Sequence, residues 1–295
     1  MELLLQQLIN GLSLGSLYAI FAIGFGLVFA NMGILNVAQG SVATWGMIPA
    51  YLLTYYAHLP FWLALIAGVV GAGIIGLIAE WLAFKPLRDR NAGMLGSIIV
   101  AVGIWIILLN LAELVLGPNP TAMPEGTFPS APLDVLGFQI PPVFILNWLA
   151  LAVVVVGLSV FLAKTRFGAA IRAVGFKPEA VSIVGVDPRV VFSVIAFMAA
   201  AIAGLAGVLT AVSTNNVSPI TGEGLMLKGF AAVVIGGFGN IRGAVIAGIG
   251  IGVLEALTMQ YLSSTFRDAI TFGLLLLFLL VRPQGIFGEL KVSRA

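Results

Sequence analysis

The sequence predicts an all-α polytopic membrane protein with about eight to nine transmembrane helices, some of them short, broken or re-entrant. Composition is the first reason: 60% of the 295 residues are hydrophobic and only 9% are charged. A soluble chain carries roughly 25% charged residues. The second reason is the recurrence of apolar runs of roughly 20 residues, the length that crosses a hydrocarbon core of about 30 Å. We therefore expect a single transmembrane domain over residues 1–295.

The apolar runs follow one another along the whole chain. They lie at residues 3–29, 42–57, 61–84, 95–116, 143–163, 190–212, 225–239, 243–262 and 269–281. The run at 225–239 is short for a full crossing, and the segment 31–41 is too polar to face lipid. If either segment is re-entrant, about eight crossings remain in place of about nine.

The basic residues predict the orientation, because Lys and Arg beside spans mark the cytoplasmic side. Lys85, Arg88 and Arg90 follow the third run, and no basic residue lies between Arg90 and Lys164. In that interval the loop 117–142 holds half of the chain's 14 prolines, so we expect an irregular extracytoplasmic loop. The same rule predicts a cytoplasmic C-terminus and an N-terminus on the outside.

Arg267 is an exception to this pattern. It falls in a short turn, 263–268, that the alternation of spans places on the outside. The adjacent Asp268 offers a charge that offsets it.

Several polar residues interrupt the apolar runs and are candidates for a polar translocation pathway. They are Asn36, Gln39, Ser41, Asn215 and Lys228. A polar solute that leaves water needs hydrogen-bond partners of this kind. For any single residue, a hydrogen bond between helices, worth about 0.6–2 kcal/mol, is the favoured explanation. Asn36 and Gln39 are favoured because they lie in a glycine-flanked break.

Glu255 is the carboxylate placed deepest in an apolar run, and we expect an interior charge there. An ionisable group inside a membrane indicates a functional site and needs a partner. Lys228 and Arg242 are the candidate partners.

The sequence offers no enzyme chemistry. It has no Cys and a single His, His58. We therefore identify no Ser-His-Asp set and no Cys/His metal cluster in the sequence. No G-x-x-x-x-G-K-[ST] pattern is present, so this chain lacks a P-loop for ATP. We predict no catalytic residue, no metal site and no cofactor in this chain.

The segment 164–189 is the longest strongly basic polar interval, with five of the chain's 14 Lys and Arg. Pro178 suits a first helical position, Glu179 complements the helix dipole, and Gly185 is a helix stop. Glu179-Ala180-Val181 followed three residues later by Gly185 resembles the EAA-x3-G loop of ABC importer permeases, with Val181 in place of the second Ala.

Four further stretches resemble branched-chain amino-acid (Liv-type) ABC permeases. They are GLSLGSLYA at 11–19, GILNVAQG at 33–40, KGFAAVVIGGFGNIRGA at 228–244 and RPQGIFG at 282–288. Val37 and Gln39 stand where Phe and His are usual in that family. These departures leave room for a related solute such as urea or a short amide.

The resemblance implies a permease subunit of an ATP-driven importer in a prokaryotic inner membrane. It implies two cytoplasmic ABC ATPase subunits that bind ATP and Mg, a second permease chain and an extracytoplasmic binding protein. Pro178, Glu179, Ala180 and Gly185 would then belong to a coupling loop that docks to an ATPase. The alternative is a proton-coupled secondary transporter or channel, in which Glu255 would be essential and loop substitutions silent.

Overall fold

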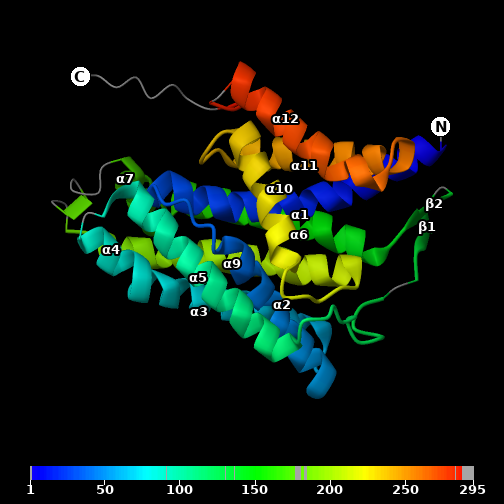
Figure 1. Cartoon of the computed structure of the whole chain (residues 1–295), viewed down its shortest axis with the longest axis horizontal. Coiled ribbons are helices and arrows are strands. Elements are labelled where there is room, and N and C mark those ends of the chain that lie inside the picture. The colour runs from blue at the N-terminus through cyan, green and yellow to red at the C-terminus, as the bar shows by residue number, and fades with distance from the viewer. Residues whose placement is uncertain are drawn as a thin grey trace.

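The computed structural model describes residues 2–90, 92–129, 131–135, 137–176, 181–182, 185–282 and 284–287. Figure 1 shows an elongated bundle of long helices that pack side by side. This arrangement confirms the predicted all-α class. The helices are α1 Glu2–Met32, α2 Gln39–Tyr56, α3 Phe61–Ala79, α4 Lys85–Asp89, α5 Gly93–Leu116, α6 Pro142–Lys164, α7 Arg166–Phe176, α9 Pro188–Thr214, α10 Thr221–Gly236, α11 Ile241–Tyr261 and α12 Arg267–Val281. A π-helical turn, Glu80–Phe84, joins α3 to α4, and a 3₁₀ turn, Ser264–Phe266, precedes α12.

Seven of these helices are long and apolar enough to cross a membrane: α1, α3, α5, α6, α9, α11 and α12. In this count α3 continues through the π-helical turn and α4 to Asp89, and α12 includes the 3₁₀ turn that precedes it. The other two long elements, α2 and α10, have 18 and 16 residues. At 1.5 Å per residue, α10 spans about 24 Å, less than a hydrocarbon core of about 30 Å. Short helices are therefore present where the sequence predicts broken segments, and the number of full crossings stays a prediction.

The two ends of the bundle differ in chemistry. We call one the basic end, because α4, the α6–α7 junction and the starts of α9 and α11 bring Arg88, Lys164, Arg189 and Arg242 there. We call the other the proline end. There the loop 117–141 contacts the α9–α10 connection through a Thr121–Val217 bridge, and Gln6 of α1 donates to the carbonyl of Gln139 at 3.0 Å.

The proline-end loop is more ordered than the sequence predicts. It carries a hairpin of β1, Leu133–Val135, and β2, Phe138–Ile140, paired antiparallel with Leu133 opposite Ile140. Gly137 adopts φ +85°, and its amide donates to the Asp134 carboxylate at 3.0 Å. Glycine reaches such a turn without strain, and this is the local reason for the hairpin.

α1 is the centre of the bundle. In the apolar stretch of α1, 83% of the residues are buried, against 11% for α5 and 6% for α12. It packs against α11 along a seam of small residues (Figure 1). A Cβ added at Gly11 or Gly15 would lie 2.6 Å from the Cα of Val253 or Ile249. Small residues four apart let membrane helices approach this closely, so the glycines of the first apolar run serve helix packing.

A second seam of small residues joins α9 to α2 and α3. A Cβ on Gly204 or Gly207 of α9 would meet Ala72 and the carbonyl of Ala43. The small residues around 203–207 therefore form a close-packing face.

The two short helices α2 and α10 meet at their N-termini. Gly222 lies against the carbonyl of Gly40, and the Gly222 amide donates to the Thr44 hydroxyl at 3.2 Å. Gln39, the first residue of α2, donates from its amide nitrogen to the carbonyl of Ala199 at 2.9 Å. Ala199 is well inside the 27-residue α9, so α2 begins inside the bundle and not at its surface.

Candidate functional site

A cluster of four charged side chains and one tyrosine lies inside the bundle, nearer the proline end. We call it the ion cluster: Tyr18, Lys228, Glu255, Arg267 and Asp268. The Lys228 ammonium and the Glu255 carboxylate are 2.7 Å apart, with 5% and 0% of their side chains exposed. Arg267 pairs with the same oxygen of Glu255, and the Tyr18 hydroxyl donates to the other at 2.8 Å. Glu255 is therefore enclosed by donors from α1, α10 and α12.

Asp268 completes the cluster at its solvent side. Its carboxylate is 3.4 Å from the Lys228 ammonium and 3.7 Å from the Arg267 guanidinium, and 64% of the side chain is exposed. Two cations and two anions make the cluster neutral overall. That balance is what a buried ionic group needs inside a membrane.

A cavity of about 360 Å³ adjoins the ion cluster at the proline end. Lys228 and Arg267 are its charged lining residues, and Leu14, Leu17 and Leu225 supply apolar wall. Cavities of this size with a few polar groups on an apolar wall suit small molecules. We call it the outer cavity.

The predicted pathway residues Asn36, Gln39 and Ser41 lie elsewhere, at the junction of α1 and α2. Asn36 donates to the Gln39 side chain at 3.1 Å, and Gln39 and Ser41 are each 1% exposed. Within the described part of the chain, Asn36 Oδ1 and the Ser41 hydroxyl have no hydrogen-bond partner. Buried polar atoms without partners are rare, so this junction has bonding capacity that the isolated chain leaves unused.

Glu80 lies next to this junction on the π-helical turn. It is 1% exposed and pairs with Arg88, whose guanidinium lies 4.0 Å from the centre of the Phe192 ring. A void of about 20 Å³ borders both Asn36 and Glu80, enough for one water. Turns of π-helix occur often at functional sites, and neither this turn nor the Arg88 contact was predicted from the sequence.

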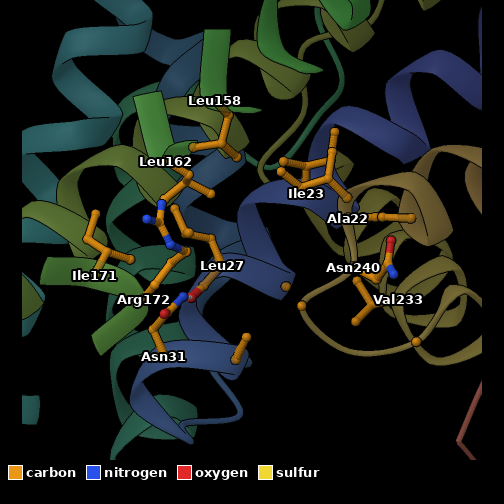
Figure 2. A pocket seen from close by; sticks show the side chains of 16 residues that line it. Ala22, Ile23, Leu27, Asn31, Leu158, Leu162, Ile171, Arg172, Val233 and Asn240 are labelled. Atoms are coloured by element: carbon orange, nitrogen blue, oxygen red, sulfur yellow. Dashed lines mark hydrogen bonds between the residues drawn. The ribbon is translucent and has the colours of Figure 1, made fainter. Parts of the chain in front are cut away.

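A second cavity, of about 200 Å³, opens at the basic end. Figure 2 shows Asn31 and Arg172 on one side and Val233 and Asn240 on the other, with Leu27 between them. Its wall is mostly apolar, and Arg172 of α7 is its one charged residue among those described. The cavity therefore lies between the spans and the helix that leads into the predicted coupling loop.

The predicted coupling residues Pro178, Glu179 and Ala180 lie outside the described residues. Gly185 is described: it is exposed, has φ +81°, and has open space where a Cβ would be. On either side of this loop, α7 packs on α1 and α9, and Asp187 caps α9 by accepting from the Arg189 amide at 2.9 Å. The helices that precede and follow the predicted loop are thus both packed in the bundle.

Asn215 has a structural task in this conformation. It ends α9 with φ 48°, and its side-chain carbonyl accepts from the Met123 amide at 3.1 Å, which fastens the proline-end loop.

Sequence reasoning proposed Lys228 as the partner of Glu255, and the structure confirms that pair. Arg242, the other candidate, begins α11 at the basic end. Tyr18 was missed, because a tyrosine in an apolar run gives no polar signal of its own.

Comparison with solved structures gives the class of protein first. PsaBC from Streptococcus pneumoniae in complex with Fab contains a chain with the same fold, at a TM-score of 0.56 and 12% identity, covering 97% of this chain and 94% of that one. The likeness shows the fold, and together with the seven helices long and apolar enough to cross a membrane it places this chain in the class of helical membrane bundles. Among the described residues, no group of three or more His, Cys, Asp or Glu could hold a metal ion.

Comparison with known sequences is more specific. The chain is 33% identical over 301 residues to the high-affinity branched-chain amino acid transport system permease protein LivH of Salmonella typhimurium, covering 98% of this chain and 97% of that protein. It is 32% identical, with the same coverage, to the corresponding permease protein BraD of Pseudomonas aeruginosa. Residues 7–280 match the family described as branched-chain amino acid transport system / permease component. The chain belongs to that family.

Proposed function

We propose that this chain is one membrane half of an ATP-driven importer of branched-chain or related hydrophobic amino acids, in a prokaryotic inner membrane with its C-terminus in the cytoplasm. Two cytoplasmic ABC ATPase subunits would supply ATP and Mg chemistry, a second permease chain would complete the pathway, and an extracytoplasmic binding protein would deliver the solute. The observation that carries the proposal is the 33% identity to LivH over nearly the whole of both chains.

The basic segment 164–189 supports coupling at its end of the bundle. α7 lies within the segment, α9 begins at its end, and both helices pack on α1. An ATPase that moves the segment would therefore move α7, which borders the basic-end cavity through Ile171 and Arg172. The outer cavity and the basic-end cavity lie at opposite ends of the bundle, so each would serve one side of the membrane in an alternating-access cycle.

Pathway roles are proposed for Lys228 at the outer cavity and for Asn36, Gln39 and Ser41 at the α1–α2 junction. Gln39 and Ser41 are buried and Asn36 is partly buried, and Asn36 and Ser41 each carry a buried atom without a partner among the described residues. A solute or a water file passing the junction would supply the missing bonds.

The test is a mild-detergent pull-down from the native membrane with mass spectrometry, on wild type, Gly185→Trp and a matched control, Gly126→Trp. Both glycines have positive φ, +81° and +78°, and neither has an atom within 4 Å of an added Cβ. Gly126 lies in the proline-end loop, so backbone strain is matched and only position differs.

Wild type and Gly126→Trp should bring down P-loop ATPases and a second polytopic chain, whereas Gly185→Trp should lose the ATPases. Vesicles holding the wild-type complex should take up leucine only with ATP and the binding protein. If no ATPase accompanies wild type and a proton gradient alone drives uptake, the importer proposal is wrong and the proton-coupled alternative takes its place.

A further inference from the structure

Among the residues that the structure describes, two positive charges and no carboxylate line the outer cavity. Lys228 and Arg267 line it, whereas Glu255 and Asp268 do not. Glu255 lies behind Lys228, fully buried, and holds the ammonium at 2.7 Å while the Tyr18 hydroxyl fixes the other carboxylate oxygen at 2.8 Å. Glu255 is therefore a positioning residue that fixes the direction of the Lys228 ammonium.

Asp268 is bound far more loosely than Glu255. It contacts both cations at long range, 3.4 Å and 3.7 Å, and is mostly exposed. Exposed ion pairs of this kind contribute little, at most about 1 kcal/mol. A carboxylate that enters the outer cavity can take the place of Asp268 between Lys228 and Arg267 without leaving either cation unpaired.

The same cavity offers an unused acceptor. Asn216 lines it, and the Oδ1 of that side chain is buried and has no hydrogen-bond donor within the part of the chain that the structure describes. A buried acceptor without a donor costs roughly 1–3 kcal/mol, and an ammonium group brings three donors. Leu14, Leu17 and Leu225 form apolar wall between these polar groups.

We propose that the outer cavity binds an L-amino acid as a zwitterion. Its α-carboxylate lies between Lys228 and Arg267, its α-ammonium donates to the Asn216 side chain, and its aliphatic side chain packs on the leucines. The inference rests on the proposed function and deepens it, since it selects a zwitterion over an uncharged amide or urea. Exchanging one neutral ion cluster for another avoids the penalty of a lone charge in the membrane.

The test uses the absence of Cys from the natural chain. Thr214 lines the outer cavity, so Thr214→Cys places a single reactive thiol there. Its rate of labelling by a maleimide is measured on purified full-length protein in detergent, with L-leucine, leucinamide or 4-methylpentanoate present. Leucinamide lacks the carboxylate and 4-methylpentanoate lacks the ammonium. Thr127→Cys in the proline-end loop is the control thiol outside the cavity.

L-Leucine should slow labelling of Thr214→Cys several-fold, each half-analogue should slow it much less, and Thr127→Cys should be unaffected. Adding Lys228→Met should remove the protection. Glu255 keeps Arg267 and Tyr18 as partners in that variant, so the protein should still fold, which size-exclusion chromatography checks. Lys228→Arg should restore part of the protection, and Lys164→Met, at the basic end, should leave it intact.

Equal protection by all three compounds, protection that survives Lys228→Met, or no protection at leucine concentrations that saturate uptake would each overturn the inference. The labelling assay contains no ATPase, so a failure of the coupling proposal leaves its result unaffected. Conversely, a complex that imports leucine with ATP but shows no protection would refute the zwitterion site alone.

Discussion

The ion cluster predicts an asymmetry between two substitutions that each remove one half of the same pair. Glu255→Leu leaves the Lys228 ammonium, only 5% exposed, with Asp268 at 3.4 Å as its remaining partner. Breaking a buried pair by removing one partner costs about 3–5 kcal/mol. Because Asp268 still offers partial compensation, we expect about 3 kcal/mol of destabilisation.

Lys228→Met should cost less, about 1–2 kcal/mol, because Glu255 keeps both Arg267 and the Tyr18 hydroxyl. The double variant Lys228→Met/Glu255→Leu removes both charges and should cost less than Glu255→Leu alone. The expected coupling between the two sites is therefore about 2 kcal/mol, within the range found for residues of one network.

Unfolding by sodium dodecyl sulfate in detergent micelles, followed by the fluorescence of the five tryptophans, measures these differences. Glu113→Leu is the matched control, since Glu113 is an exposed carboxylate near the proline end of α5. Strict additivity of Lys228→Met and Glu255→Leu would refute the reasoning, because it would mean that the pair does not share its environment.

Two further predictions concern the helix seams. Gly252→Val should prevent close packing of α11 on α1 and lower the yield of folded protein sharply, because an added Cβ would meet Gly15. Gly250→Val should be tolerated, because a Cβ added at Gly250 has no atom within 4 Å. Fluorescence-detected size-exclusion chromatography compares the yields of the two variants. Asn147→Leu should destabilise the protein by about 1 kcal/mol, because the buried Asn147 amide donates to the Ser13 and Ser213 hydroxyls at 2.9 and 3.0 Å. Asn110→Leu is its control, since Asn110 bonds only within its own helix, and equal losses for the two variants would contradict the role of Asn147.

The sequence predicted the helical membrane class well because hydrocarbon leaves so few solutions. Runs such as 95–116 and 143–163 must be helices when no water satisfies their backbone groups, and α5 and α6 fall within a few residues of these bounds. The glycines of residues 3–29 follow the same logic, because small residues in a membrane helix permit the close approach seen in the α1–α11 seam.

Partners distant in the sequence were harder to predict. Glu80 pairs with Arg88, two turns on, and not with Lys85, one turn away, because the π-helical turn 80–84 changes which side chains share a face. Asn215 resembled a pathway residue, yet its role depends on a contact with Met123, 92 positions away. Polarity within an apolar run signals that a partner exists and does not identify it.

Arg267 gave the most informative signal, although it first read as an exception. A basic residue in a turn on the outer side conflicts with the distribution of the other basic residues. The structure removes the conflict, because the guanidinium pairs inward with Glu255 as well as lying 3.7 Å from its neighbour Asp268. A cation in that position does not act as a topological marker, because its charge is cancelled within the protein. An isolated departure from the basic-residue pattern beside a deep carboxylate therefore indicates a buried ion pair, and in this chain it indicates the wall of the outer cavity.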